Sequence, residues 1–265
     1  MKTRLILKTV KDRWRSITLW CVGLVALGAV QLSVYPTVRD AAEGMNQFIE
    51  AFPDAFKAIF RMEDYVSGPG YLGTELFSLT LPLIFLTVGS SWGAAATAED
   101  EENGTADLLL ALPLSRFKIW ISKNLALAGV LVTMGTIIYV VLRVGSLLVD
   151  MSIDSIPLLA GVVSCMFLGY FFSSLAGAIG AAMGRKSAAL GVSIAVAISS
   201  FVFYSLAPLV DTFDAILPFN PFEWAIGGKP LVNGFIWIDL AKLVVFSAAL
   251  NIVAVRLFMK RDIRI

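Results

Sequence analysis

Five stretches of this sequence run for at least 19 residues without a charged side chain. They are Ser16–Val38, Leu76–Ala98, Asn124–Leu142, Ser155–Gly184 and Ser187–Val210. A helix needs about 20 apolar residues to cross the hydrocarbon core of a bilayer. A sixth stretch, Leu240–Met259, carries Lys242 and Arg256 only near its ends, where long side chains reach the interface. The sequence therefore predicts an all-α integral membrane protein with six transmembrane helices.

Composition and the pattern between these stretches give the rest of the expected layout. The 265 residues are 58% hydrophobic and 15% charged, whereas a soluble domain is about half apolar and about a quarter charged. We place the spans of a single domain, 1–265, at about 16–36, 76–98, 119–146, 156–183, 187–210 and 240–259. Residues 1–15 form a basic, amphipathic stretch that predicts an interface helix.

Two longer segments, 36–75 and 211–238, are expected as outer loops. The first has apolar residues at three-or-four spacing, which predicts one or two short amphipathic helices, the second beginning at Pro53. The other loop is interrupted by several Pro and Gly residues, which makes a straight helix impossible and favours a partly re-entrant path buried against protein.

Basic residues set the expected orientation. Of the 21 Lys and Arg residues, 15 fall on the side of the N-terminus and six on the other. The six are Arg39, Lys57, Arg61, Arg143, Lys229 and Lys242. By the positive-inside rule, both termini are expected in the cytoplasm, with the chain in the plasma membrane of a prokaryotic cell. The net charge of +1 gives no indication of nucleic-acid binding.

Several kinds of chemistry are excluded. The chain has no histidine, which excludes the usual zinc sites and Ser–His triads, and Cys21 and Cys165 lie inside apolar spans. No P-loop is present: the stretch from Gly180 to Ser187 has the wrong glycine spacing and an Arg in place of the Walker lysine. We therefore predict no catalytic or metal site in this chain, and any nucleotide must bind to another polypeptide.

Residues 99–123, between the second and third spans, differ from an ordinary loop. An unbroken acidic run, 99–102, is followed by Gly104, which permits a sharp turn, and Thr105, a candidate N-cap. Leucines at 108–110 and 112 then predict a short apolar helix that ends at Pro113. A helix this apolar outside the membrane needs a surface that buries it.

This run resembles the signature of type-2 ATP-binding-cassette (ABC) export permeases: Glu-x-Gly-Thr, Leu-Leu, Pro-x-Ser-Arg, then Lys. The matching residues are Glu102, Gly104, Thr105, Leu108, Leu109, Pro113, Ser115, Arg116 and Lys123. The resemblance implies that segment 99–116 contains a short cytoplasmic coupling helix. The implied contacts to the ATPase are Glu99, Asp100, Glu101, Glu102, Gly104, Thr105, Asp107, Leu108, Leu109, Pro113, Ser115 and Arg116.

The same resemblance implies partners and a mechanism. Two copies of a separate cytoplasmic ATPase would bind ATP and Mg, and a second copy of this chain or a similar permease would complete the pore. Docking of the coupling helix would transmit ATPase closure to the spans, and Arg116 would anchor the third span. The unbroken acidic run predicts a basic rim on the ATPase. The resemblance implies export, and the uncharged spans suggest a hydrophobic or amphipathic substrate: a drug, antibiotic, peptide or lipid.

Two other classes remain open. An ion-coupled carrier normally has acidic or basic residues at mid-membrane, and the predicted spans have none there. A non-transporting immunity or scaffold protein would share the span pattern without needing an ATPase. A partner ATPase would distinguish both from an exporter.

Overall fold

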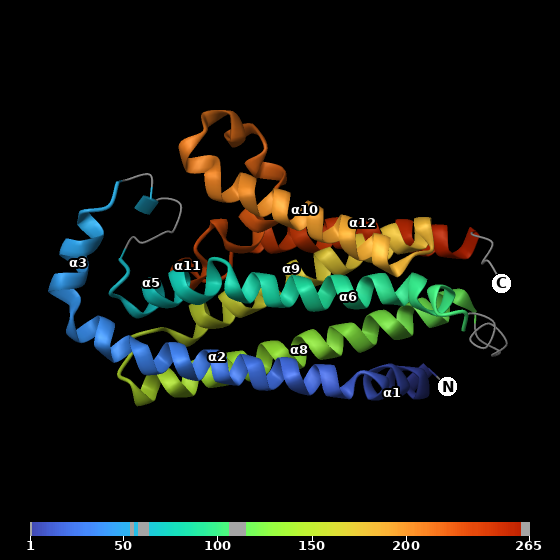
Figure 1. The fold of residues 1–265 in the computed structure, drawn as a ribbon, viewed down its shortest axis with the longest axis horizontal. Helices are drawn as coiled ribbons and strands as arrows, with labels where there is room; N and C mark the ends of the chain where they lie inside the picture. Colours follow the sequence, from blue (N-terminus) through green and yellow to red (C-terminus); the bar gives the residue numbers. More distant parts are fainter. Residues whose placement is uncertain (1, 54–55, 58–63, 106–114, 261–265) are drawn as a thin grey trace.

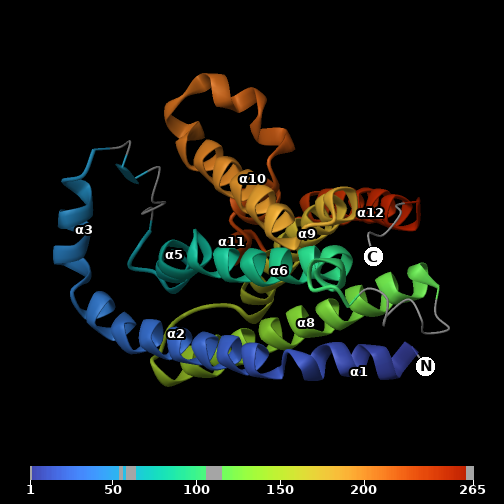
Figure 2. The same ribbon diagram turned by 45° about the vertical axis from the view of Figure 1, so that its right-hand side comes forward.

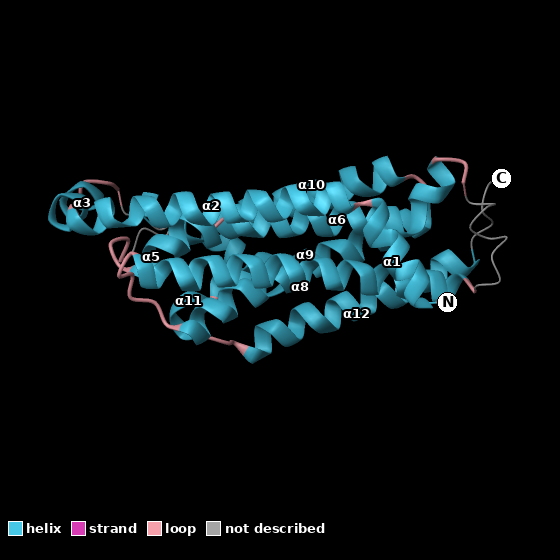
Figure 3. Cartoon of the chain, turned by 90° about the horizontal axis from the view of Figure 1, so that it is seen from below, coloured by secondary structure: helices cyan, strands magenta, loops and turns pink. Residues whose placement is uncertain are grey.

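Long helices make up the framework of the molecule. The computed structural model describes residues 2–53, 56–57, 64–105 and 115–260, and in these parts the secondary structure is helical, without strands (Figure 3). Six helical segments are long and apolar enough to cross a membrane, as the charge-free stretches predict. They contain α2 (Trp14–Asp40), α6 (Thr80–Glu102), α8 (Arg116–Leu148), α9 (Ser155–Met183), α10 (Lys186–Leu206) and α12 (Trp237–Lys260).

The helices run past most of the predicted span ends. Helix α2 continues through Pro36 as far as Asp40, into the segment that we expected as a loop. Proline inside a helix removes one hydrogen bond, and an apolar span can tolerate that loss close to its end. Helix α8 begins at Arg116, because the hydroxyl of Ser115 accepts a hydrogen bond from the backbone N–H of Lys118 and caps it.

Helix α9 lies at the centre of the bundle. It is the most buried of the six spans, and it packs against α6, α12, α10 and α8 (Figures 1 and 2). Its tightest contact is with α6, where a Cβ on Gly93 would lie 2.0 Å from the carbonyl oxygen of Ser173. Small residues at this crossing let the two backbones touch. In lipid there is no hydrophobic driving force between helices, so this close van der Waals packing holds them together.

The N-terminal segment is a helix of its own. Helix α1 (Lys2–Asp12) leads into α2 through a break at Arg13, and it packs against α8. Whether α1 lies in the membrane interface remains a prediction.

Short elements fill the end of the bundle where the two predicted outer loops meet. After α2 come α3 (Ala42–Glu50), α5 (Gly68–Leu72) and a π-helical turn, η1 (Gly73–Phe77), which leads into α6. Helix α3 is one of the predicted amphipathic helices. The second falls mostly outside the described residues, although the backbone N–H groups of Phe56 and Lys57 both donate to the carbonyl of Pro53.

The return between α10 and α12 is broken, as its Pro and Gly residues predict. It consists of 3₁₀ turns η2 (Ala207–Leu209), η3 (Asp211–Ala215) and η4 (Leu217–Phe219), the π-helical turn η5 (Glu223–Gly227) and α11 (Pro230–Asn233). Phe222, Trp224 and Ile226 are buried in a cluster with α9. Asn220 fixes the entry to η5: its amide nitrogen donates to the carbonyl of Ser200, and its amide oxygen accepts from the N–H of Phe222.

Both described ends of the chain lie at one end of the bundle. Figures 1 and 2 place the start of α1, the end of α6, the start of α8 and the end of α12 together, opposite α3, α5 and α11. The α9–α10 hairpin reaches the same end, because Lys186 contacts Glu99 at the end of α6.

Candidate functional site

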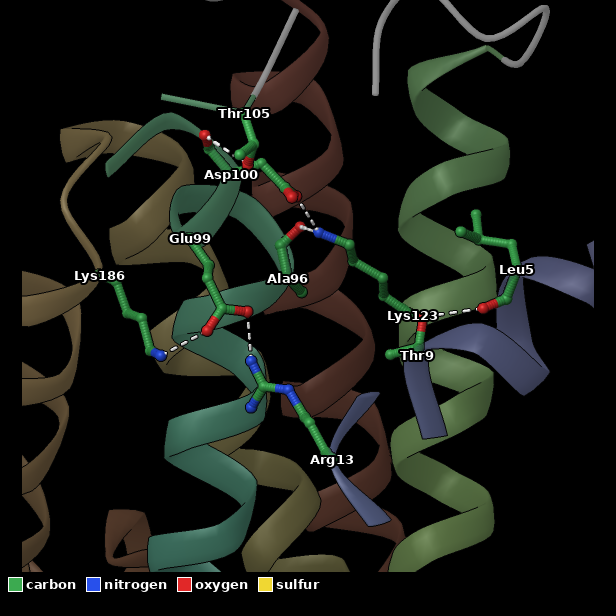
Figure 4. Close-up of polar contacts among 9 residues, drawn as sticks. All are labelled: Leu5, Thr9, Arg13, Ala96, Glu99, Asp100, Thr105, Lys123 and Lys186. Atoms are coloured by element: carbon green, nitrogen blue, oxygen red, sulfur yellow. Dashed lines mark hydrogen bonds and ion pairs between the residues drawn. The ribbon is translucent and has the colours of Figure 1, made fainter. Parts of the chain in front are cut away.

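The last turn of α6 carries the acidic run, and its side chains reach basic groups of the same chain. Glu99 lies between the guanidinium of Arg13 and the ammonium of Lys186, as Figure 4 shows. The Lys186 Nζ to Glu99 Oε1 distance is 2.6 Å. One carboxylate therefore connects α6 to the α1–α2 junction on one side and to the start of α10 on the other.

The next acidic residue ties α6 to α8. The ammonium of Lys123 donates to the carboxylate of Asp100 at 2.5 Å and to the carbonyl of Ala96 at 3.3 Å (Figure 4). We refer to Arg13, Glu99, Asp100, Lys123 and Lys186 as the ion-pair cluster. Its side chains are only 14–34% exposed, so these pairs are screened less by solvent than pairs on an open surface.

Glu102 caps a helix that is remote in sequence. Its carboxylate accepts hydrogen bonds from the backbone N–H groups of Lys186, at 2.5 Å, and Ser187, at 3.2 Å. These N–H groups belong to the first turn of α10, which has no earlier carbonyls to pair with. A carboxylate there also interacts favourably with the positive end of the helix dipole. Glu102 therefore fixes the start of α10 to the end of α6.

The chain leaves α6 by a Schellman turn. Gly104 has φ of +66°, as its predicted role in a sharp turn requires. The N–H of Gly104 donates to the carbonyl of Glu101, and the N–H of Thr105 to the carbonyl of Asp100, which is the 6→1 and 5→2 pattern of this motif. The backbone N–H of Thr105 thus closes the turn that follows the last residue of α6, Glu102. Its predicted role as N-cap concerns a helix from residue 106 onward, outside the described residues.

The return from the connecting segment is fixed at α8 and α12. Beyond the Ser115 cap, the guanidinium of Arg116 donates to the carbonyl oxygen of Phe258, near the C-terminal end of α12, at 3.1 Å. Arg116 therefore joins the first turn of α8 to the last turns of α12. The remaining predicted contacts, Asp107, Leu108, Leu109 and Pro113, lie outside the described residues.

A further contact orients Arg13. Its guanidinium carbon lies 5.0 Å from the ring centroid of Trp92 on α6, within the range of a cation–π interaction. The sequence places Arg13, Lys123 and Lys186 among the basic residues of the inner side, and Lys123 also at the last position of the motif. The excess of basic residues on that side was the available signal, but pattern alone could not pair each with an acid.

The described signature residues thus lie at the end of α6 and on α8: Glu102, Gly104 and Thr105 at the first place, and Ser115, Arg116 and Lys123 at the second. A model of the ABC-2 family transporter protein matches residues 5–263, which is nearly the whole chain. The chain belongs to the ABC-2 transporter family. No curated protein sequence matches it. This ABC-2 transporter is a multi-pass permease of the plasma membrane. Permeases of this family are transport components that are generally not catalytic themselves. Family membership implies association with an ATP-binding subunit and often with a second permease.

Proposed function

We propose that this chain is the membrane-spanning subunit of an exporter driven by a separate cytoplasmic ATPase. Residues 99–116 form its coupling segment and dock on that ATPase, which binds ATP and Mg. Two ATPase copies act on two permeases, either two copies of this chain or this chain and a similar permease. Both termini lie in the cytoplasm, which is where the positive-inside rule puts the side with 15 of the 21 Lys and Arg residues.

The ion-pair cluster is the observation that carries the proposal. The carboxylates that begin the coupling segment are bound to groups on α1–α2, α8 and α10. A displacement of this segment therefore shifts several helices together, which a loop anchored only at its own two ends would not do. Coupling between distant sites requires such a physically connected set of elements. Glu99, Asp100 and Glu102 bind groups of the same chain, so the apolar residues 108–112 are better candidates than these acids for the docking contact.

A hydrophobic or amphipathic substrate suits the spans of this permease. Polar residues on α6 and α10 form neutral hydrogen bonds inside the bundle, such as the one between the hydroxyls of Ser90 and Ser193 at 3.0 Å. Carriers that couple to ions use charged side chains at this depth. The proposed direction is export across the plasma membrane of a prokaryotic cell, with energy supplied from the cytoplasmic side.

The proposal is tested by purifying the tagged chain from its native membranes in a mild detergent. We expect a co-purifying protein with a P-loop and ATPase activity, in equal amount to the chain. Leu109→Asp places a charge on the predicted docking helix and is expected to abolish this association. Val232→Asp introduces the same charge at an exposed apolar residue of α11, at the opposite end of the bundle, and is the matched control, expected to retain the ATPase.

Each outcome bears on a different part of the proposal. Association that survives Leu109→Asp would move the docking contact away from the coupling helix. A wild-type chain that repeatedly purifies without any ATPase, under conditions that keep other transporter complexes intact, would refute the exporter function.

A further inference from the structure

The side of the bundle carries a groove between α8 and α12, close to the end where both termini lie. Its cavity volume is about 330 Å³. Helix α8 contributes Phe117, Trp120 and Ile121 to its lining, and α12 contributes Ile252, Val255 and Arg256. The groove thus has apolar walls and a single guanidinium.

The groove exists because α8 and α12 both pack on α9 more than on each other. Asn251 holds α12 against α9, since its amide nitrogen donates to the hydroxyl of Ser174 at 2.7 Å. Trp120 is buried and packs on the small residues Ala178 and Ala254. Closer to the chain ends, the Arg116 contact to Phe258 joins the two helices again. The groove opens sideways between these two ties.

Arg256 gives the groove its charge. Its side chain is exposed, and it forms no ion pair or hydrogen bond with the residues that the structure describes. It lies five residues, or about 7.5 Å along the helix, beyond Asn251. It is also four residues before Lys260, the last residue of α12. This is the depth at which a span ends and lipid phosphates begin, and where Arg side chains reach toward the interface.

From these features we infer that the groove binds an anionic phospholipid, with its phosphate on Arg256 and an acyl chain against Phe117, Ile121 and Ile252. The apolar walls of the groove would contact the acyl chains, which do not distinguish one phospholipid from another. The guanidinium of Arg256 favours a headgroup with a net negative charge. Basic pockets between transmembrane helices on the cytoplasmic side recognise lipids in this way. The proposed orientation places this site in the inner leaflet. Lipid binding at this site does not depend on the ATPase. The lipid inference can therefore be refuted while the exporter function stands, and the exporter function can be refuted while the lipid inference stands.

The basic residues around the mouth support this occupant over a second protein chain. The first turn of α8 supplies Arg116 and Lys118, and the end of α12 supplies Lys260, without an acidic residue in either stretch. A second copy would present the same positive face and be repelled. Anionic lipid headgroups are attracted by about 1 kcal/mol for each such residue near the surface.

The test is competition between two lipids for the purified full chain in detergent. The chain is mixed with equal amounts of dioleoylphosphatidylglycerol and dioleoylphosphatidylcholine, and bound lipids are counted by native mass spectrometry. We expect preferential binding of phosphatidylglycerol. Arg256→Gln is expected to reduce this preference about fivefold, the effect of removing one such charge contact. Lys242→Gln makes the same charge change near the N-terminal end of α12, away from the groove, and it should leave most of the preference intact.

A second variant separates the groove from general surface charge. Ile252→Trp fills the groove without changing charge and should reduce binding of both lipids. Helix content from circular dichroism verifies that each variant is folded. The inference is overturned if phosphatidylcholine binds as well as phosphatidylglycerol, if Arg256→Gln behaves as wild type, or if Lys242→Gln reduces the preference as much as Arg256→Gln does.

Discussion

Replacing Glu99 by Gln should destabilise the bundle through two helix contacts at once. The substitution keeps the size of the side chain but removes the charge that faces Arg13 and Lys186. Fully exposed ion pairs contribute about 0.2–1 kcal/mol, whereas hydrogen bonds to charged groups contribute about 1.5–3 kcal/mol. Arg13 is 21% exposed, and Glu99 and Lys186 are each 30% exposed. We therefore assign about 1 kcal/mol to each pair, and a loss of about 2 kcal/mol to Glu99→Gln.

The assay is a double-mutant cycle on the free energy of unfolding. SDS is titrated into the chain in mixed micelles, and helix content is followed by circular dichroism. Glu99→Gln and Lys186→Gln, alone and together, should show an interaction energy of about 1 kcal/mol, because the second substitution removes a pair that the first has already broken. Lys242→Gln is the control, since Lys242 pairs with Asp239 at the N-terminal end of α12, away from the ion-pair cluster. It should be additive with Glu99→Gln to within about 0.5 kcal/mol.

The same variants test whether the cluster transmits motion. If the cluster connects the coupling segment to α2 and α10, Glu99→Gln should leave the ATPase bound while transport per ATP hydrolysed falls. An interaction energy between Glu99 and Lys186 near zero would refute the structural argument. A variant with the expected loss of stability and full transport would show that the cluster holds the fold without taking part in coupling.

Two further predictions concern packing and orientation. Gly93→Ala should lower the free energy of unfolding by about 1–3 kcal/mol, because its Cβ would overlap a carbonyl oxygen of α9. Gly129→Ala, where a Cβ meets nothing within 4 Å, should raise it by about 0.5–1 kcal/mol in the same titration; equal effects of the two would contradict the close α6–α9 contact. In a chain without its two native cysteines, a cysteine at Arg185 should react with a membrane-impermeant maleimide only in inverted vesicles. One at Asn233 should react only in intact cells, and the opposite result would reverse the proposed orientation.

Residues in the coupling segment show what pattern alone could predict about the site. Gly104 was expected to permit a sharp turn from its residue type, and it has the left-handed backbone that such a turn requires. Ser115 was named only as a position of the family signature, and the structure shows that it is the N-cap of α8. The acidic run was predicted to face a basic rim on the ATPase. The structure places basic groups of the chain itself against Glu99 and Asp100, while the ATPase contact remains a prediction.

The sequence by itself determined the number and character of the spans, because a helix that crosses a bilayer must be apolar and its length is set by the thickness of the bilayer. It also determined the sharp turn at Gly104, since such a turn depends on the residue itself and its close neighbours. Only the tertiary structure decided which helix lies at the centre and which cation meets Glu99. Lys186 is 87 residues away in the sequence. Such pairings depend on how the backbones of α6 and α9 approach, which no local pattern of residues encodes.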